Sequence, residues 1–65
     1  MVKVRVEGTD RFELFETPIS VGKILKKLDF LPFEVLVINK NRLLTRDIVL
    51  RDDEEIILRV VYSKG

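Results

Sequence analysis

The chain has 65 residues, 46% of them apolar and 35% charged, which fits one small folded domain and excludes a disordered chain. Its 12 basic and 11 acidic residues give a net charge of +1, which argues against a nucleic-acid-binding protein. It has no cysteine or histidine, and so lacks thiolate chemistry and the commonest acid–base group and metal ligand; we expect no enzyme, metal site or cofactor.

Two alternating segments near the N-terminus predict a β-hairpin. In residues 2–7, VKVRVE, valines alternate with charged side chains, which is typical of a strand buried on one face. Residues 8–11, GTDR, supply turn formers. The next segment, RFELFE at 11–16, alternates again with Phe12 and Leu14 on one face, so we expect the two strands to pair.

The spacing of apolar residues changes to that of a helix after Pro18. Ser20 is expected to cap the helix N-terminus, and DFLP at 29–32 to end the helix. The apolar residues at i, i+3, i+4 and i+7 spacing are Val21, Ile24, Leu25 and Leu28. The lysines on the other face are Lys23, Lys26 and Lys27. We interpret this basic face as solvated surface, and a docking surface for an acidic partner is the alternative.

The second half of the chain predicts further extended segments. Residues 34–39, EVLVIN, are apolar on both faces, which indicates a strand that is covered on both sides or lies beside a partner. The segments that follow are a tight turn at 39–42, a short extended piece at Leu43 and Leu44, a loop or single turn at 45–50, a polar turn at 51–54 and the most apolar strand at 55–62. We interpret the acidic run at 52–55 as a solvated turn, because its spacing does not match a known calcium loop.

The order strand, strand, helix, strand, short strand, strand predicts an α+β fold. A mixed sheet of four or five strands packed on one amphipathic helix gives these elements a single core. This is the β-grasp, ubiquitin-like arrangement, in which the first and last strands lie parallel at the centre of the sheet. Both of those strands are rich in β-branched residues, as central strands are. We expect one domain at 1–62 and a short flexible C-terminal tail at 63–65.

Hydropathy predicts a cytoplasmic protein. No apolar run approaches the ~20 residues that are needed to cross a bilayer. The N-terminal stretch MVKVRVEG alternates instead of forming the continuous apolar region of a secretion signal. We expect the free protein to be a monomer.

Three stretches together are typical of one family. They are VLVIN with its following turn at 35–41, the acidic turn DDEE at 52–55, and IILRVVY at 56–62 running into a short tail. With the matching length, they make the whole chain resemble the ubiquitin-like sulfur carriers of the ThiS/MoaD type, which include the archaeal small modifier proteins. That family usually has Asp-Gly-Asp where this chain has Asp52-Asp53-Glu54, and a final Gly-Gly where it has Lys64-Gly65.

The resemblance implies a protein co-substrate. In such carriers a partner adenylating enzyme activates the C-terminal glycine, which then carries a thiocarboxylate to a sulfur-accepting synthase or forms an isopeptide with a lysine. Gly65 is then the site of activation, and Tyr62, Ser63 and Lys64 are expected to determine which partner accepts the tail. Glycine suits this role because it lacks a Cβ and can enter a narrow channel.

The last strand also predicts a partner-binding surface. The positions that the resemblance places towards the helix are Ile56, Leu58, Val60 and Tyr62. Alternation then leaves Ile57, Arg59 and Val61 on the opposite face of the sheet, where we expect them beside Lys3 and Arg5. Apolar residues ringed by charge on a central strand are typical of a docking surface. The alternative is that a loop or a second copy covers them.

Two other functions remain open. A non-conjugating β-grasp interaction module would keep the docking face and lack the tail chemistry, which would account for the missing Gly-Gly. An RNA-binding β-grasp domain fits the near-neutral charge less well. The interaction module predicts that loss of residues 63–65 leaves partner binding intact and that Ile57→Asp abolishes it.

Overall fold

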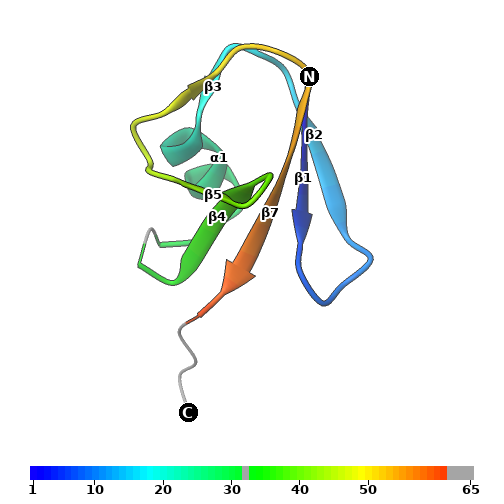
Figure 1. Cartoon of the computed structure of the whole chain (residues 1–65), viewed down its shortest axis with the longest axis vertical. Helices are drawn as coiled ribbons and strands as arrows, with labels where there is room; N and C mark the ends of the chain where they lie inside the picture. The colour runs from blue at the N-terminus through cyan, green and yellow to red at the C-terminus, as the bar shows by residue number, and fades with distance from the viewer. Residues whose placement is uncertain (32, 62–65) are drawn as a thin grey trace.

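The computed structural model describes residues 1–31 and 33–61. In these residues the chain forms a five-stranded sheet, a two-stranded sheet and one helix (Figure 1). The elements are β1 Val2–Val6, β2 Phe12–Phe15, β3 Ile19–Ser20, α1 Val21–Lys27, β4 Val35–Asn39, β5 Arg42–Leu44, β6 Val49–Leu50 and β7 Glu54–Val60. The helix in this part of the chain is too short to cross a bilayer.

The larger sheet has the strand order β2-β1-β7-β4-β5. Its two central strands, β1 and β7, run parallel, and every other pair is antiparallel. The prediction of an α+β fold with a mixed sheet and one helix is therefore confirmed, as is the parallel pairing of the first and last strands. This topology is compatible with the β-grasp arrangement.

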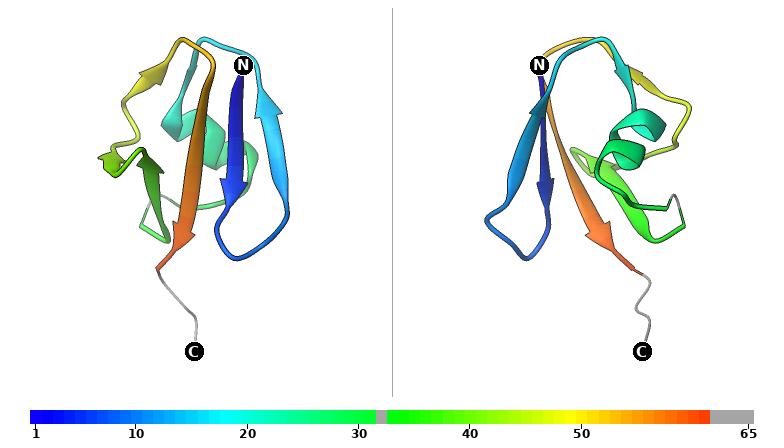
Figure 2. Two further views of the ribbon diagram at one scale, coloured as in Figure 1. Left: turned by 45° about the vertical axis from the view of Figure 1, so that its right-hand side comes forward. Right: turned by 180° about the vertical axis from the view of Figure 1, so that it is seen from behind.

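The core lies between α1 and one face of the larger sheet, and the other face has no described element over it (Figure 2). The residues that contribute to this core are Val2, Val4, Ile19, Val21, Ile24, Leu25, Val35, Val37, Leu50, Ile56 and Leu58. A helix of seven residues is too short to be stable by itself in water. It forms here because its apolar face, at the spacing seen in the sequence, is buried against the sheet.

Both ends of α1 are capped by local hydrogen bonds. Ser20 is extended, and its Oγ accepts a bond of 3.1 Å from the Lys23 N–H, which confirms the predicted N-cap. At the other end Phe30 N–H donates to the Leu25 carbonyl (2.9 Å) and Asp29 N–H to the Lys26 carbonyl (3.2 Å), the two bonds of a Schellman motif. Asp29 occupies the left-handed position of that motif, with φ of 65°.

The segment at 45–50 differs from the expected loop. It contains β6, which pairs with β3 to form the smaller sheet. Its backbone also receives the first N–H groups of the helix, because Val21 N–H donates to the Ile48 carbonyl and Gly22 N–H to the Arg46 carbonyl, both at 2.9 Å. A strand of two residues is too short to show the alternation of apolar and polar residues, so the sequence pattern alone did not indicate β6.

The tight turn predicted at 39–42 is confirmed and determines how β4 and β5 pair. Lys40 and Asn41 have φ of 48° and 68°, as the central residues of a type I′ hairpin turn require. The resulting register places Ile38 opposite Leu43.

Candidate functional site

The face of the larger sheet opposite α1, called the open face below, carries a row of side chains that crosses all its strands. Directly paired residues in a sheet point to the same side. Arg5 pairs with Phe12 of β2 and with Ile57 of β7. Ile57 also pairs with Ile38 of β4, which pairs in turn with Leu43 of β5. The row is therefore Phe12–Arg5–Ile57–Ile38–Leu43.

Much of this row is apolar and accessible to a partner. Phe12 is 52% exposed and Leu43 is 65% exposed at its two ends, while Ile57 and Ile38 are half-buried at its centre. Leu14 and Leu36 extend the same face, at 54% and 36% exposed. Apolar side chains gathered on one face, instead of scattered singly, are typical of a surface that is covered in a complex.

Cations surround the apolar residues on the open face. Lys3 pairs with Leu14 on one side and Glu55 on the other, and its ammonium lies 4.6 Å from the centre of the Phe12 ring, within reach of a cation–π contact. Arg59 lies opposite Leu36 on the same face. Lys3, Arg5 and Arg59 thus outnumber the one carboxylate paired within the face, that of Glu55.

One of these cations is held by a carboxylate next to the face. Arg59 donates from Nε to one oxygen of Glu7 (2.8 Å) and from a terminal nitrogen to the other (3.0 Å). This bidentate hydrogen bond and the charge of Arg59 lower the pKa of Glu7. The same hydrogen bond and the charge of Glu7 raise the pKa of Arg59. Because Arg59 is fixed in this way, Lys3 and Arg5 are better placed to pair with carboxylates of a partner.

A shallow hollow lies within the open face. Ile38 and Ile57 line it together with Arg5, Lys40 and Glu55. Its apolar residues come from the two adjacent strands β4 and β7, and the charged ones surround them. Such a hollow suits an apolar side chain of a partner flanked by polar groups.

The predicted site residues fall into two groups. Ile57, Arg59, Lys3 and Arg5 lie together on the open face. Val61 follows the end of β7; it is 52% exposed, and its N–H donates to the Glu34 carbonyl at 2.9 Å. The predicted activation site and tail residues lie outside the described residues; they are Tyr62, Ser63, Lys64 and Gly65.

Sequence reasoning did not include the other apolar residues of the open face. These are Phe12, Leu14, Leu36, Ile38 and Leu43. One signal for them was present, because residues 34–39 are apolar on both faces and so predict a second contact for β4. The contribution of β2 and β5 depends on the pairing register, which the sequence pattern does not give.

Two carboxylates of the acidic run at 52–55 form hydrogen bonds within the fold. Asp53 accepts a bond of 2.5 Å from the Met1 amino group, which lowers the pKa of this carboxyl. Glu54 accepts from the Asn39 side-chain amide at 2.6 Å. Among residues 1–31 and 33–61, carboxylates do not gather in a group that would hold a metal ion.

Comparison with known proteins identifies no family. No protein-family model matches the chain, and no curated protein matches it. The chemistry available on the open face is therefore the basis for assigning a function: it can bury apolar side chains and pair with carboxylates.

Proposed function

We propose that this chain is a ubiquitin-like, β-grasp protein-binding domain that docks its partners on the open face. The observation that carries the proposal is the row Phe12–Arg5–Ile57–Ile38–Leu43, in which four apolar side chains and one cation run across the whole sheet. The core already uses the opposite face of every one of these strands for α1 and its neighbours. The open face is thus free to serve a partner without cost to the core.

The partner should present an apolar centre and carboxylates around it. Ile57 and Ile38 offer the half-buried centre on which apolar side chains pack, and burial of apolar area supplies most of the binding free energy in such interfaces. Arg5 and Lys3 then favour acidic residues at the rim, which steer the encounter and fix the orientation.

Two substitutions on the open face test this proposal. Ile57→Asp places a carboxylate at the centre of the row, and Leu43→Asp places one at its exposed end, where folding is least affected. The wild-type chain, immobilised on a column, retains partner proteins from an extract of its own cells. We expect both variants to lose the binding of these proteins, as measured by quantitative mass spectrometry. Val49→Asp is the matched control, because Val49 is 44% exposed on β6, in the smaller sheet. If all three variants lost the retained proteins equally, or if none of them did, the proposal would be contradicted.

A carrier or modifier of the ThiS/MoaD type is the second candidate function. It is favoured by the position of β7, which supplies Ile57 and Arg59 to the open face and continues directly into Val61 and the last residues of the sequence. A partner docked on this face would be held close to where β7 ends. An adenylating enzyme bound there would then act on the carboxylate of Gly65, and a sulfur-accepting synthase or a lysine would receive the product.

The carrier function has its own test, made on protein whose last residue is Gly65. We expect a cognate adenylating enzyme and ATP to release pyrophosphate in the presence of the chain. With a sulfide donor added, AMP should leave and intact mass should show sulfur in place of one carboxylate oxygen; with a lysine acceptor, AMP should leave and intact mass should show an isopeptide-linked conjugate. Removal of residues 63–65 should abolish this chemistry but leave docking on the open face unchanged. A truncated chain that no longer docks would contradict the division between docking face and tail.

A further inference from the structure

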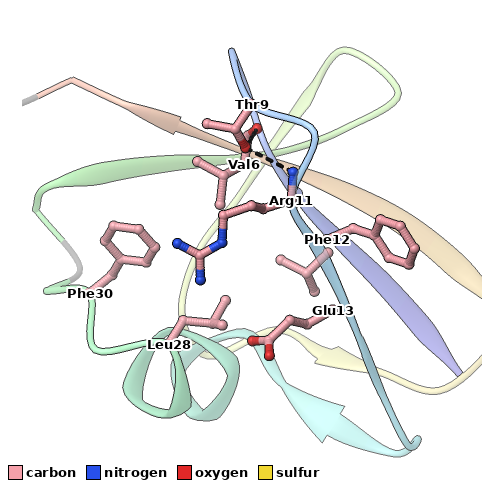
Figure 3. A pocket seen from close by; sticks show the side chains of 8 residues that line it. Val6, Thr9, Arg11, Phe12, Glu13, Leu28 and Phe30 are labelled. Atoms are coloured by element: carbon pink, nitrogen blue, oxygen red, sulfur yellow. Dashed lines mark hydrogen bonds between the residues drawn. The ribbon is translucent and has the colours of Figure 1, made fainter.

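A largely apolar hollow lies between β2 and the end of α1, on the side of the larger sheet that carries the core (Figure 3). Its volume is about 140 Å³. The apolar residues that line its floor are Val4, Val6, Leu28 and Phe30. An apolar cavity of about 150 Å³ holds one benzene molecule, so this hollow has room for a single apolar side chain and not for a larger ligand.

Two opposite charges stand at the mouth of this hollow. Glu13 pairs with the core residue Val4, so its side chain points to the helix side of the sheet. Arg11 is two residues earlier and points to the same side, with its Cα about 7 Å from that of Glu13. Figure 3 shows the Arg11 guanidinium between Phe30 and Leu28, and the Glu13 carboxylate on the other side of Leu28.

The turn before β2 fixes the backbone of Arg11. Thr9 Oγ1 accepts from the Arg11 N–H (3.2 Å) and donates to the Val6 carbonyl (2.9 Å). The Val6 N–H donates to the Arg11 carbonyl (3.3 Å), which extends the ladder of β1 and β2 to this residue. The position from which the guanidinium extends is therefore set by the fold.

Both charges are available to a ligand. Among residues 1–31 and 33–61, neither the guanidinium of Arg11 nor the carboxylate of Glu13 takes part in an ion pair. A guanidinium presents a planar fork of donors that fits a carboxylate, and a carboxylate accepts hydrogen bonds from an ammonium group. An apolar floor with an unpaired cation and an unpaired anion at its mouth suits a ligand that carries all three complementary groups.

We propose that this hollow binds a free α-amino acid with a branched aliphatic side chain, such as leucine. The ligand carboxylate pairs with Arg11 and its ammonium with Glu13, while its side chain packs on Val6, Leu28 and Phe30. The isobutyl group of leucine fits the volume of the hollow, whereas the indole of tryptophan exceeds it. The site lies on the side of the sheet opposite the open face, so it does not depend on the proposed docking function.

The C-terminal residue of a partner protein fits the site less well. It would bring a carboxylate and an apolar side chain, but its nitrogen belongs to an amide and carries no charge. Glu13 would then lose water without gaining an opposite charge, which weakens binding. The pair of opposite charges therefore favours a small zwitterion.

The test is an NMR titration of the isotope-labelled full chain with leucine at neutral pH. We expect saturable shifts of the signals of Val6, Leu28, Phe30 and the Arg11 side chain. The dissociation constant should be about 1 mM, because both charge pairs are exposed to water and the buried apolar group is small. Alanine should bind about 50-fold more weakly, because it lacks three of the carbons that leucine buries.

Derivatives of leucine identify each charge pair. Leucinamide lacks the carboxylate and N-acetyl-leucine lacks the ammonium, so each should bind the wild-type chain about threefold more weakly than leucine. Arg11→Gln should remove the preference for leucine over leucinamide, and Glu13→Gln the preference for leucine over N-acetyl-leucine. Glu16→Gln is the control, because Glu16 follows β2 at the end away from the hollow and should leave both preferences unchanged. All three residues are exposed, so the variants should keep the fold, which circular dichroism checks.

Three results would overturn the proposal. One is the absence of saturable shifts at leucine concentrations well above the expected dissociation constant. Another is binding of leucinamide or N-acetyl-leucine as tight as that of leucine, which would mean that the hollow accepts any apolar group or the C-terminus of a partner. The third is a set of shifts centred on Ile38 and Ile57, which would place leucine on the open face. These measurements use no partner protein, so they are independent of the test of docking on that face.

Discussion

The ion pair between Arg59 and Glu7 links the end of β7 to the residue that follows β1. It lowers the pKa of Glu7, so the folded chain holds the ionised carboxylate more strongly than the unfolded chain does. The stabilisation is complete above the unfolded pKa, which is about 4.3 for a glutamate. It is lost as the pH falls through the lower pKa of the folded state.

Substitution of Glu7 should therefore have a pH-dependent effect. We expect Glu7→Gln to lower the melting temperature slightly at pH 7 and to have no effect at a pH below the folded pKa, as measured by circular dichroism. Glu16→Gln is the control, because Glu16 forms no ion pair with another described residue. A Glu7→Gln effect that is the same at both pH values would show that the loss comes from packing and not from the charge pair.

Asp29 is a residue whose backbone conformation favours a different side chain. Its φ of 65° lies in the left-handed region, where glycine is the usual residue at the end of a helix. Its carboxylate also stands at the C-terminal end of α1, where the helix dipole disfavours negative charge. We expect Asp29→Gly to raise the free energy of unfolding by about 0.5–1 kcal/mol, measured by urea denaturation.

A second variant separates the two causes at this position. Asn tolerates the left-handed region and carries no charge, so Asp29→Asn should give only the smaller, electrostatic part of the gain. If neither variant were more stable than the wild type, the Schellman geometry at Asp29 would not be a source of strain.

At the level of elements, α1 depends on the segment at 45–50 for its first turn. Gly22 donates to the Arg46 carbonyl, and a Cβ at position 22 would lie 3.1 Å from that same oxygen. Alanine would raise helix propensity by about 1 kcal/mol but would crowd a backbone group whose movement disturbs the pairing of β6 with β3. Since overpacking costs about 1–3 kcal/mol, we expect Gly22→Ala to lower the free energy of unfolding by roughly 1 kcal/mol.

The control for this substitution is Lys26→Ala, at an exposed helix position. It should change the free energy of unfolding little, because lysine and alanine have similar helix propensity. Urea denaturation of both variants measures the difference. A more stable Gly22→Ala variant would mean that the segment at 45–50 moves aside without loss.

The main elements of the fold follow from local patterns. Alternation predicts β1 and β7, and the i, i+3, i+4, i+7 spacing with Ser20 predicts α1 and its cap. The pair β3 and β6 could not be predicted, because each has only two residues and forms through pairing of distant segments. This pair is seen only in the folded structure, where Leu50 of β6 packs in the core.

The candidate site was predictable only in part. Alternation within β7 separates Ile57 and Arg59 from the core residues Ile56 and Leu58. In β2 alternation gives two sets of residues but does not say which set faces the helix. The hairpin register decides this, and it places Phe12 opposite Arg5 on the open face. Turn lengths set such registers, so a row across several strands appears only in the folded structure.

At the scale of the whole molecule, the two faces of the larger sheet have different roles. α1 covers one face and forms the core with it, whereas the open face offers apolar side chains with cations around them.

Cross-saturation NMR of one complex shows which surface of the chain a bound partner covers, and so whether partners dock on the open face. The experiment uses the labelled full chain in complex with a partner retained by the wild type and lost by Ile57→Asp. We expect saturation to reach the amides of Ile57, Ile38 and Arg5 first, and to leave those of α1 and β6 unaffected. Saturation centred on α1 and β6, with β7 and β4 unaffected, would contradict docking on the open face.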